Sequence, residues 1–173
     1  MKKFIDRLFG RNTAKNAVKE KSIDDILGLS NDTTIVIEIG KKLWRKSKND
    51  KNLESLNEYE KNVLYLEMLE GQVNNGGFDQ YFFNSSGEYS QETSNALQEI
   101  GALKMLEILE QAIKVFPSLP IPKDTETRRE LMQDLPQEIN QKWNELDQNF
   151  YVNAENSENL VIEYVKKNKK YFE

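Results

Sequence analysis

The sequence predicts an all-α, single-domain bundle of about seven helices. Three observations support this fold class. Apolar side chains return every three or four residues in one segment after another, which is the spacing of a helix face rather than of a strand. Residues typical of helix ends, such as Asn57, Asp124 and Pro136, stand between those segments. The 173 residues are 31% charged and 38% hydrophobic, which suits one small helical core with solvated outer faces.

Residues 1–29 are predicted to form a basic, loosely held N-terminal arm. Its start, "MKKFIDRLFGRN", has one amphipathic turn, and the polar run "GRNTAKNAVKEKS" follows it. Such a turn could contact an anionic surface reversibly, or the arm could simply dock on the protein or stay unfolded. No segment approaches the roughly 18 apolar residues of a membrane span, and Asp6 and Arg7 interrupt the apolar patch that a secretory signal would need. We therefore expect a cytoplasmic protein.

The helical domain is predicted over residues 30–173. Its first helix, over residues 32–48, ends in lysines and an arginine, as helix C-termini favour. The next helix begins at the capping residue Asn57 and is expected to be central, because it has one long apolar stripe: Tyr59, Val63, Leu66 and Val73. Two helical segments then meet near Gly101, and Pro117 ends the second of them.

Three further helices complete the predicted domain. Asp124 caps a helix that runs to Leu135, and Pro136 opens the next one. That helix has an apolar stripe at the spacing i, i+4, i+7 and i+11: Ile139, Trp143, Leu146 and Phe150. Ser157 is expected to cap the last helix, which continues to Phe172.

The chain has no cysteine and no histidine. Their absence excludes disulfides, thiol nucleophiles, catalytic triads with histidine and histidine-ligated metals. An enzyme with this composition would have to use carboxylates, lysine, tyrosine or carboxylate-held Mg²⁺. The pairs Glu67 with Glu70 and Glu107 with Glu110 could each share a helix face, but no third ligand can be identified. We therefore predict no catalytic residue, no metal and no cofactor.

Charge is distributed unevenly along the chain. Residues 1–48 hold 12 Lys and Arg against 6 Asp and Glu, residues 49–165 hold 8 against 22, and residues 166–173 hold 4 against 1. The net charge of −5 therefore hides an acidic body between two basic ends. An acidic body repels phosphates, so we expect no direct binding to nucleic acid and favour a basic protein partner.

The stretch "NNGGFDQYFFNSSGEYS", residues 74–90, concentrates glycines, amides and aromatic side chains. The helical spacing on both sides predicts a Gly-Gly helix joint near residues 74–78 instead of a hairpin. Gly76 or Gly77 can adopt the positive φ of a helix C-terminal cap, and Ser90 can cap the helix that follows.

Two interpretations of this stretch remain open. In the first, the aromatic side chains fill the core and the amides satisfy the backbone at a bend. In the second, the stretch from Asn74 to Gly87 lines a pocket for a small molecule or a peptide. The candidate pocket residues are Asn74, Asn75, Gly76, Gly77, Phe78, Gln80, Tyr81, Phe82 and Asn84.

The run "LEGQVNNGGFDQYFFNSSGEYSQETSNALQEIGALKMLEILEQAIKVFP", residues 69–117, resembles the signature of a bacterial domain family of unknown function. One member of that family is a DNA-mimic protein that binds a transcription factor. The resemblance implies an all-helical fold, no known catalytic activity and a fold compatible with a homodimer. The signature does not encode the surface carboxylates on which mimicry depends.

A DNA mimic must present carboxylates at roughly phosphate spacing on a rigid surface, and residues i and i+4 of a helix lie about 6 Å apart. Three sets of acidic residues offer this spacing: Glu126, Glu130 and Asp134; Glu54 and Glu58; and Glu88 and Glu92, which Glu99 follows. Ordinary solvated helix faces are also acidic, and Arg128 and Arg129 partly neutralise the first set. We predict a non-enzymatic protein-interaction domain, with mimicry towards a basic DNA-binding regulator, and keep small-molecule or peptide binding as the alternative.

Overall fold

The computed structural model describes residues 21–48, 53–153 and 156–173, and all regular structure in these ranges is helical. The α-helices are α2 (Ile23–Leu27), α3 (Asp32–Lys46), α4 (Glu58–Phe83), α5 (Ser90–Ile100), α6 (Leu103–Lys114), α7 (Thr125–Gln133), α8 (Gln137–Asn153) and α9 (Ser157–Lys167). Three 3₁₀ turns accompany them: η1 (Leu53–Ser55), η2 (Ser85–Tyr89) and η4 (Lys169–Tyr171). The predicted all-α bundle is confirmed. No helix in the described ranges is long and apolar enough to cross a membrane.

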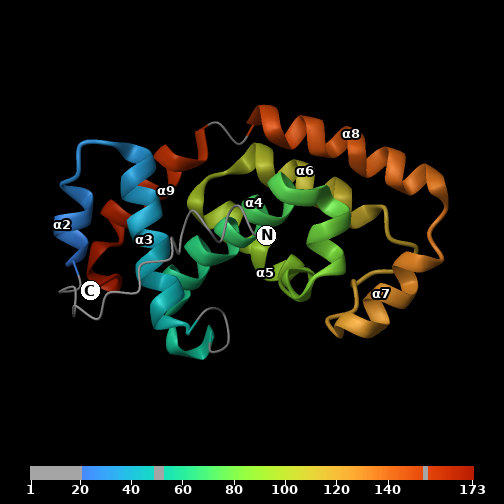
Figure 1. Ribbon diagram of the computed structural model, residues 1–173, viewed down its shortest axis with the longest axis horizontal. Helices are drawn as coiled ribbons and strands as arrows, with labels where there is room; N and C mark the ends of the chain where they lie inside the picture. The colour runs from blue at the N-terminus through green and yellow to red at the C-terminus, as the bar shows by residue number, and fades with distance from the viewer. Residues whose placement is uncertain (1–20, 49–52, 154–155) are drawn as a thin grey trace, which may run out of the picture.

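Helix α4 runs through the middle of the elongated molecule (Figure 1). Helices α2, α3 and α9 lie together at one end, and α7 lies at the other with part of α8 (Figure 1). Helix α4 packs against α5 and α8, α6 packs against α8, and α3 packs against α9. The C-terminus returns to α2, where Lys169 Nζ lies 2.6 Å from Asp24 Oδ1. The central position predicted for the helix after Asn57 is therefore confirmed.

The packed body begins earlier than residue 30. Ser22 and Asp25 form a reciprocal capping box at the start of α2. Ile23 and Ile26 are each 2% exposed and belong to the core. Residues 21–29, which the sequence assigned to the arm, thus belong to the folded body, because two isoleucines three apart place one face of this short helix against α3. The amphipathic turn at the start of the predicted arm lies outside the described residues.

The core at the α8 end is built largely from aromatic side chains. The predicted stripe of α8 faces inward, with Trp143, Leu146 and Phe150 buried and Ile139 packed against them. The ring of Phe82 lies 4.9 Å from that of Phe116 and 5.5 Å from that of Trp143, measured between centroids. These tilted and edge-on arrangements are favourable for aromatic rings.

Two of the predicted helix caps are confirmed and two are wrong. The side chains of Asn57 and Asp124 accept hydrogen bonds from the backbone N–H groups of Glu60 and Thr127, as N-caps do. Ser90 and Ser157 are instead the first residues of α5 and α9. Tyr89 and Asn156 occupy the cap positions without capping through their side chains, because neither residue has the extended backbone that a cap requires.

Candidate functional site

The Gly-Gly joint divides α4 into two helical segments. Gly76 has φ −165° and ψ 25°, and Gly77 has φ 73° and ψ −174°. The conformation of Gly77 belongs to a region that is essentially restricted to glycine. The predicted joint is confirmed, and Gly77 is the residue with positive φ.

Helix α8 holds both ends of the broken helix. Asp147 Oδ1 accepts a 2.8 Å hydrogen bond from the backbone N–H of Phe78, the first residue of the second segment. The Tyr151 hydroxyl donates a 3.1 Å hydrogen bond to the carbonyl of Val73 at the end of the first segment. A helix break leaves such backbone groups without partners. Two side chains of α8 provide the hydrogen bonds that capping residues within α4 would otherwise make. A Cβ atom on Gly77 would overlap the Asp147 carboxylate, which gives a second reason for glycine there.

The aromatic candidates of the joint face the core. Phe78, Tyr81 and Phe82 are each 0% exposed. The Tyr81 hydroxyl lies 3.0 Å from Thr93 Oγ1 on α5. These contacts agree with the interpretation in which the aromatic side chains of the joint fill the core.

The amide candidates of the joint form a hydrogen-bonded chain with a residue that the sequence analysis did not select, Gln72. Asn75 donates to Gln80 at 2.7 Å, Gln80 donates to Gln72 at 2.7 Å, and Asn84 donates to the same Gln72 oxygen at 2.8 Å. Asn74 is exposed. The chain links the two segments of α4 across the joint, which is a structural role. Ligand binding by the nine candidates stays a prediction.

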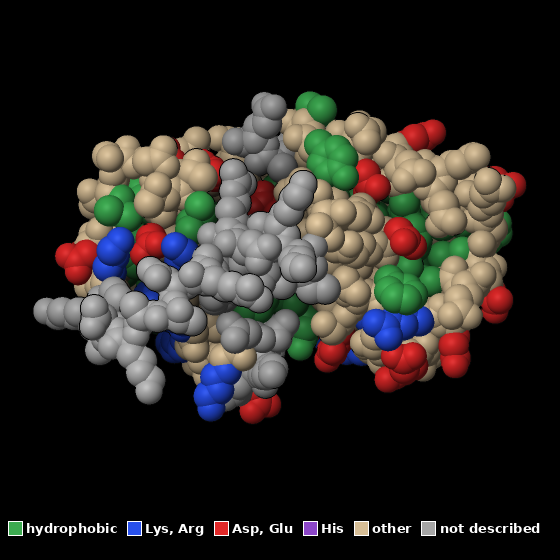
Figure 2. All heavy atoms as spheres, in the orientation of Figure 1, with side chains coloured by type: hydrophobic (Ala, Val, Ile, Leu, Met, Phe, Trp, Pro, Cys, Tyr) green, Lys and Arg blue, Asp and Glu red, His purple; other side chains and the backbone are tan. Residues whose placement is uncertain are grey.

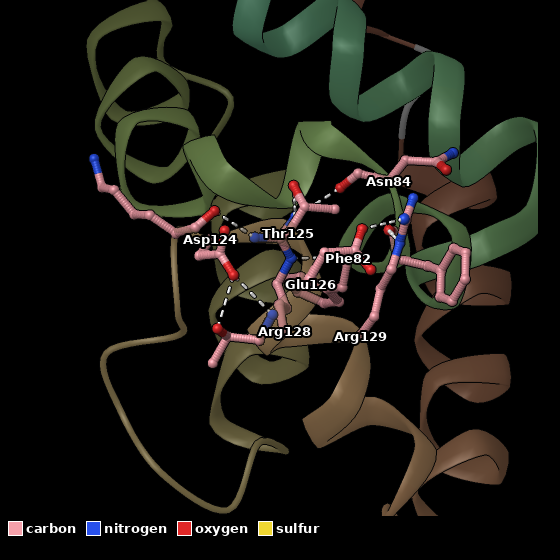
Figure 3. Close-up of polar contacts among 10 residues, drawn as sticks. Phe82, Asn84, Asp124, Thr125, Glu126, Arg128 and Arg129 are labelled. Atoms are coloured by element: carbon pink, nitrogen blue, oxygen red, sulfur yellow. Dashed lines mark hydrogen bonds and ion pairs between the residues drawn. The ribbon is translucent and has the colours of Figure 1, made fainter.

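Arg128 anchors the C-terminal end of α4 (Figure 3). Its side chain is 0% exposed. Its Nε donates to the carbonyl of Phe82 at 2.6 Å, and its Nη2 donates to the carbonyl of Asn84 at 2.8 Å. Nη1 adds bonds of 2.8 Å and 2.9 Å to the carbonyls of Pro122 and Lys123. Burial lowers the pKa of Arg128, and the guanidinium stays charged because arginine is not deprotonated in proteins.

This position of Arg128 corrects the sequence analysis, which counted it among the surface charges that neutralise the acidic set on α7. The helical face that carries Arg128 is turned towards α4, so its charge reaches carbonyl oxygens instead of the surface carboxylates.

A hollow of about 250 Å³ opens beside the joint. Its lining consists of Gly76, Asp79, Asn140, Trp143, Asn144 and Asp147. Burial raises the pKa of Asp147, the Phe78 N–H opposes that rise, and the neighbouring Asp79 carboxylate adds to it. Burial also raises the pKa of Asp79. Of the nine candidate pocket residues, Gly76 alone lines this hollow. The sequence did not indicate that α8 residues would line it, because their role depends on the packing of α8 against α4.

The acidic candidates differ in how free their charges are. Arg129 Nη1 lies 2.7 Å from Glu126, and the Arg129 guanidinium also covers the Phe83 ring at 4.5 Å. Glu92 is paired with Lys123. The remaining candidates form no ion pair within the described residues, namely Glu88, Glu99, Glu130 and Asp134.

These candidates do not form one surface. Glu130 and Asp134 are exposed on α7. Glu88 is half-buried in η2, close enough to Arg128 to influence its pKa. Glu99 lies at the other end of α5, beside Tyr59 and Tyr164. The structure therefore brings together the α7 pair and separates Glu99 from it.

Several carboxylates of the acidic body are buried. Glu60 is enclosed and bonded to Lys46 Nζ at 2.7 Å and 2.8 Å. Burial raises the pKa of Glu67 to about 8, with a further rise from Glu70, while Trp44 opposes it. Burial raises the pKa of Glu70 to about 7, and contact with Ser157 opposes that rise. The acidic count of the sequence therefore overstates the negative charge at the surface. Within the described residues, no group of three or more acidic side chains is placed to hold a metal ion.

Comparison with known proteins identifies the family. A family model described as "DMP19-like protein" matches residues 54–168, which is more than half of the chain and includes the joint, Arg128 and Asp147. No curated protein and no solved structure matches the chain. The extent of the family match shows that this chain belongs to the DMP19-like protein family.

Proposed function

We propose that this protein is a non-enzymatic interaction domain that acts as a DNA mimic. In this proposal, carboxylates on rigid helices occupy the basic surface of a DNA-binding protein and compete there with duplex DNA. The observation that carries the proposal is the match to the DMP19-like family, whose name denotes DNA mimic protein 19. A basic surface built for phosphates also attracts carboxylates at similar spacing.

The distribution of charge supports a basic partner at the α7 end. Lys and Arg side chains gather around α2 and α3 on the face in view, whereas Asp and Glu side chains predominate over α7 and α8 (Figure 2). Glu130 and Asp134 project from the α7 end, and Arg128, which could have neutralised them, is turned into the protein. A partner that approaches this end meets free carboxylates before it meets the lysines of α3 and α9.

For the alternative function, small-molecule or peptide binding by the stretch from Asn74 to Gly87, the aromatic candidates are buried, and Gly76 is the one candidate that lines the neighbouring hollow. This function stays a prediction, as do the homodimer and the cytoplasmic location.

The proposal can be tested by retention of proteins from a bacterial lysate on the immobilised, purified chain at low and at high salt, with identification by mass spectrometry. We expect a basic DNA-binding protein to be retained at low salt and released at high salt, because exposed charge pairs are screened. Duplex DNA should compete for that protein and should not itself bind the immobilised chain.

A matched pair of variants makes the test specific to α7. The variant Glu130→Gln with Asp134→Asn removes two free charges at the α7 end, and Glu54→Gln with Glu163→Gln removes two exposed charges elsewhere. The first variant should retain less of the basic protein than the second. Equal losses, or no basic protein retained at low salt, would contradict the proposal.

A further inference from the structure

We propose that the hollow beside the glycine joint is a socket for one arginine side chain of a basic partner protein. The inference deepens the proposed function and rests on it, because the proposed function supplies a basic partner. A site for one arginine would add a specific contact to the general attraction between the acidic helices and a basic partner.

The socket is built by two elements that meet at the joint. Asn140, Asn144 and Asp147 lie at i, i+4 and i+7 of α8 and therefore project from one face of that helix. Asp79 lies near the start of the second segment of α4, and Gly76 lines the hollow beside it. The volume of about 250 Å³ is ample for a guanidinium group.

Asp147 provides the observation that points to a cation. This side chain is 8% exposed, so its carboxylate is largely withdrawn from water. Oδ1 accepts the hydrogen bond from Phe78 N–H, and Oδ2 receives none from any described residue, although it is not sealed from solvent. Buried carboxylates are normally paired or fully hydrogen-bonded. Oδ2 lies against the backbone of Gly77, and Asp147 lines the hollow, so Oδ2 is the carboxylate oxygen left to accept a hydrogen bond from a bound ligand.

The polar groups of the hollow select for guanidinium. The two carboxylates repel anions, and the two asparagine side chains add amide oxygens that can accept further hydrogen bonds. A guanidinium has five N–H donors in a plane and is less strongly hydrated than an ammonium group, so it enters a half-buried site at lower cost than lysine. Trp143 adds an apolar residue to the lining of the hollow.

The effect of burial on the two aspartates agrees with this assignment. Both carboxyl groups have raised pKa values because burial disfavours their charged forms, and the Asp79 carboxylate raises the pKa of Asp147 further. A bound cation favours the charged forms and would lower both pKa values.

The test uses NMR of the ¹⁵N-labelled full chain, titrated with a blocked Gly-Arg-Gly peptide and separately with blocked Gly-citrulline-Gly. Citrulline has nearly the shape of arginine but no charge. We expect saturable shifts with the arginine peptide at the backbone amides of Phe78 and Asp79 and at the side-chain amides of Asn140 and Asn144. The citrulline peptide should bind at least about tenfold more weakly, since charged hydrogen bonds are the stronger class.

Two variants locate the site. Asp147→Asn keeps an oxygen that can accept the hydrogen bond from Phe78 N–H and removes the charge. Asp79→Asn removes the second charge from a side chain that is exposed to solvent although partly desolvated. Each should weaken binding of the arginine peptide, and Asp79→Asn keeps the test decisive if Asp147→Asn does not fold. The variant Glu54→Gln with Glu163→Gln removes two exposed charges that do not line the hollow, and it should leave the affinity for the peptide unchanged. Shifts spread over the whole acidic surface, equal binding of citrulline, or full affinity in Asp79→Asn would overturn the socket.

The outcomes separate the socket from the proposed function. If the arginine peptide saturates the hollow and no basic protein is retained from lysate, the socket stands and mimicry fails. If a basic protein is retained at low salt but the arginine peptide does not bind the hollow, mimicry stands and the socket fails.

Discussion

Replacement of Gly77 by alanine should destabilise the protein far more than an ordinary glycine replacement. Its backbone, at φ 73° and ψ −174°, costs a residue with a Cβ atom about 1–3 kcal/mol. The new Cβ would also displace the Asp147 carboxylate and break its 2.8 Å bond to Phe78 N–H, a charged hydrogen bond of a class worth about 1.5–3 kcal/mol. Alanine also restricts the backbone of the unfolded chain, which offsets about 0.4–1 kcal/mol of this loss of stability. We therefore expect the free energy of unfolding to fall by about 2–5 kcal/mol.

Gly101 offers a matched control. It also has positive φ, 87°, but a Cβ there would meet no atom within 4 Å. Gly101→Ala should therefore cost about 0–1.6 kcal/mol, because the same effect on the unfolded chain offsets part of the penalty of about 1–2 kcal/mol for a left-handed residue. Both variants can be compared by urea denaturation followed by far-UV circular dichroism.

A double-mutant cycle separates the two contributions at Gly77. In the background Asp147→Ser, which removes most of the obstructing carboxylate, Gly77→Ala should cost less than in the native chain, because only backbone strain remains. The reasoning is refuted if Gly77→Ala costs no more than Gly101→Ala, or if its cost is the same with and without the Asp147 carboxylate.

Three further predictions concern buried groups. The pKa of Glu67 rises from 4.5 to about 8 on folding, so its contribution to stability is full below about pH 4.5 and is lost as the pH rises towards 8. In Glu67→Gln, the free energy of unfolding should therefore decrease less steeply with pH across this range, by up to about 1.4 kcal/mol per pH unit. Urea denaturation at several pH values measures this dependence, and an unchanged dependence would contradict the prediction. Arg128→Lys should cost about 2–4 kcal/mol because lysine cannot reach all the carbonyls that Arg128 contacts. Arg129→Lys should cost under about 1 kcal/mol. Similar losses of stability for the two variants in thermal unfolding would argue against Arg128 as the anchor of α4. Tyr81→Ala should cost about 3–5 kcal/mol and Tyr81→Phe about 1 kcal/mol, and an alanine variant with unaltered stability would instead favour the pocket interpretation.

The sequence alone determined the features that depend on neighbours in the chain. The helical class, the stripe of α8, the caps at Asn57 and Asp124 and the Gly-Gly break follow from spacing and from the backbone preferences of single residues, which act within one or two helical turns. The absence of histidine and cysteine likewise limits the chemistry available to the chain, whatever its fold. Local signals failed at Ser90 and Ser157, where each helix begins at the serine itself instead of after it.

Only the tertiary structure decided which polar groups meet and which charges remain at the surface. Asp147 caps a helix that begins 69 residues earlier, and nothing in its own neighbourhood marks it for that role. Arg128 and Arg129 are adjacent in sequence, yet one is buried against carbonyls and the other covers Phe83 at the surface. Glu67 counts as a negative charge in the sequence, but burial favours its neutral form. The physical reason is common to all three: hydrogen-bond partners and desolvation depend on which helix faces pack together, and sequence spacing defines the faces without defining their neighbours.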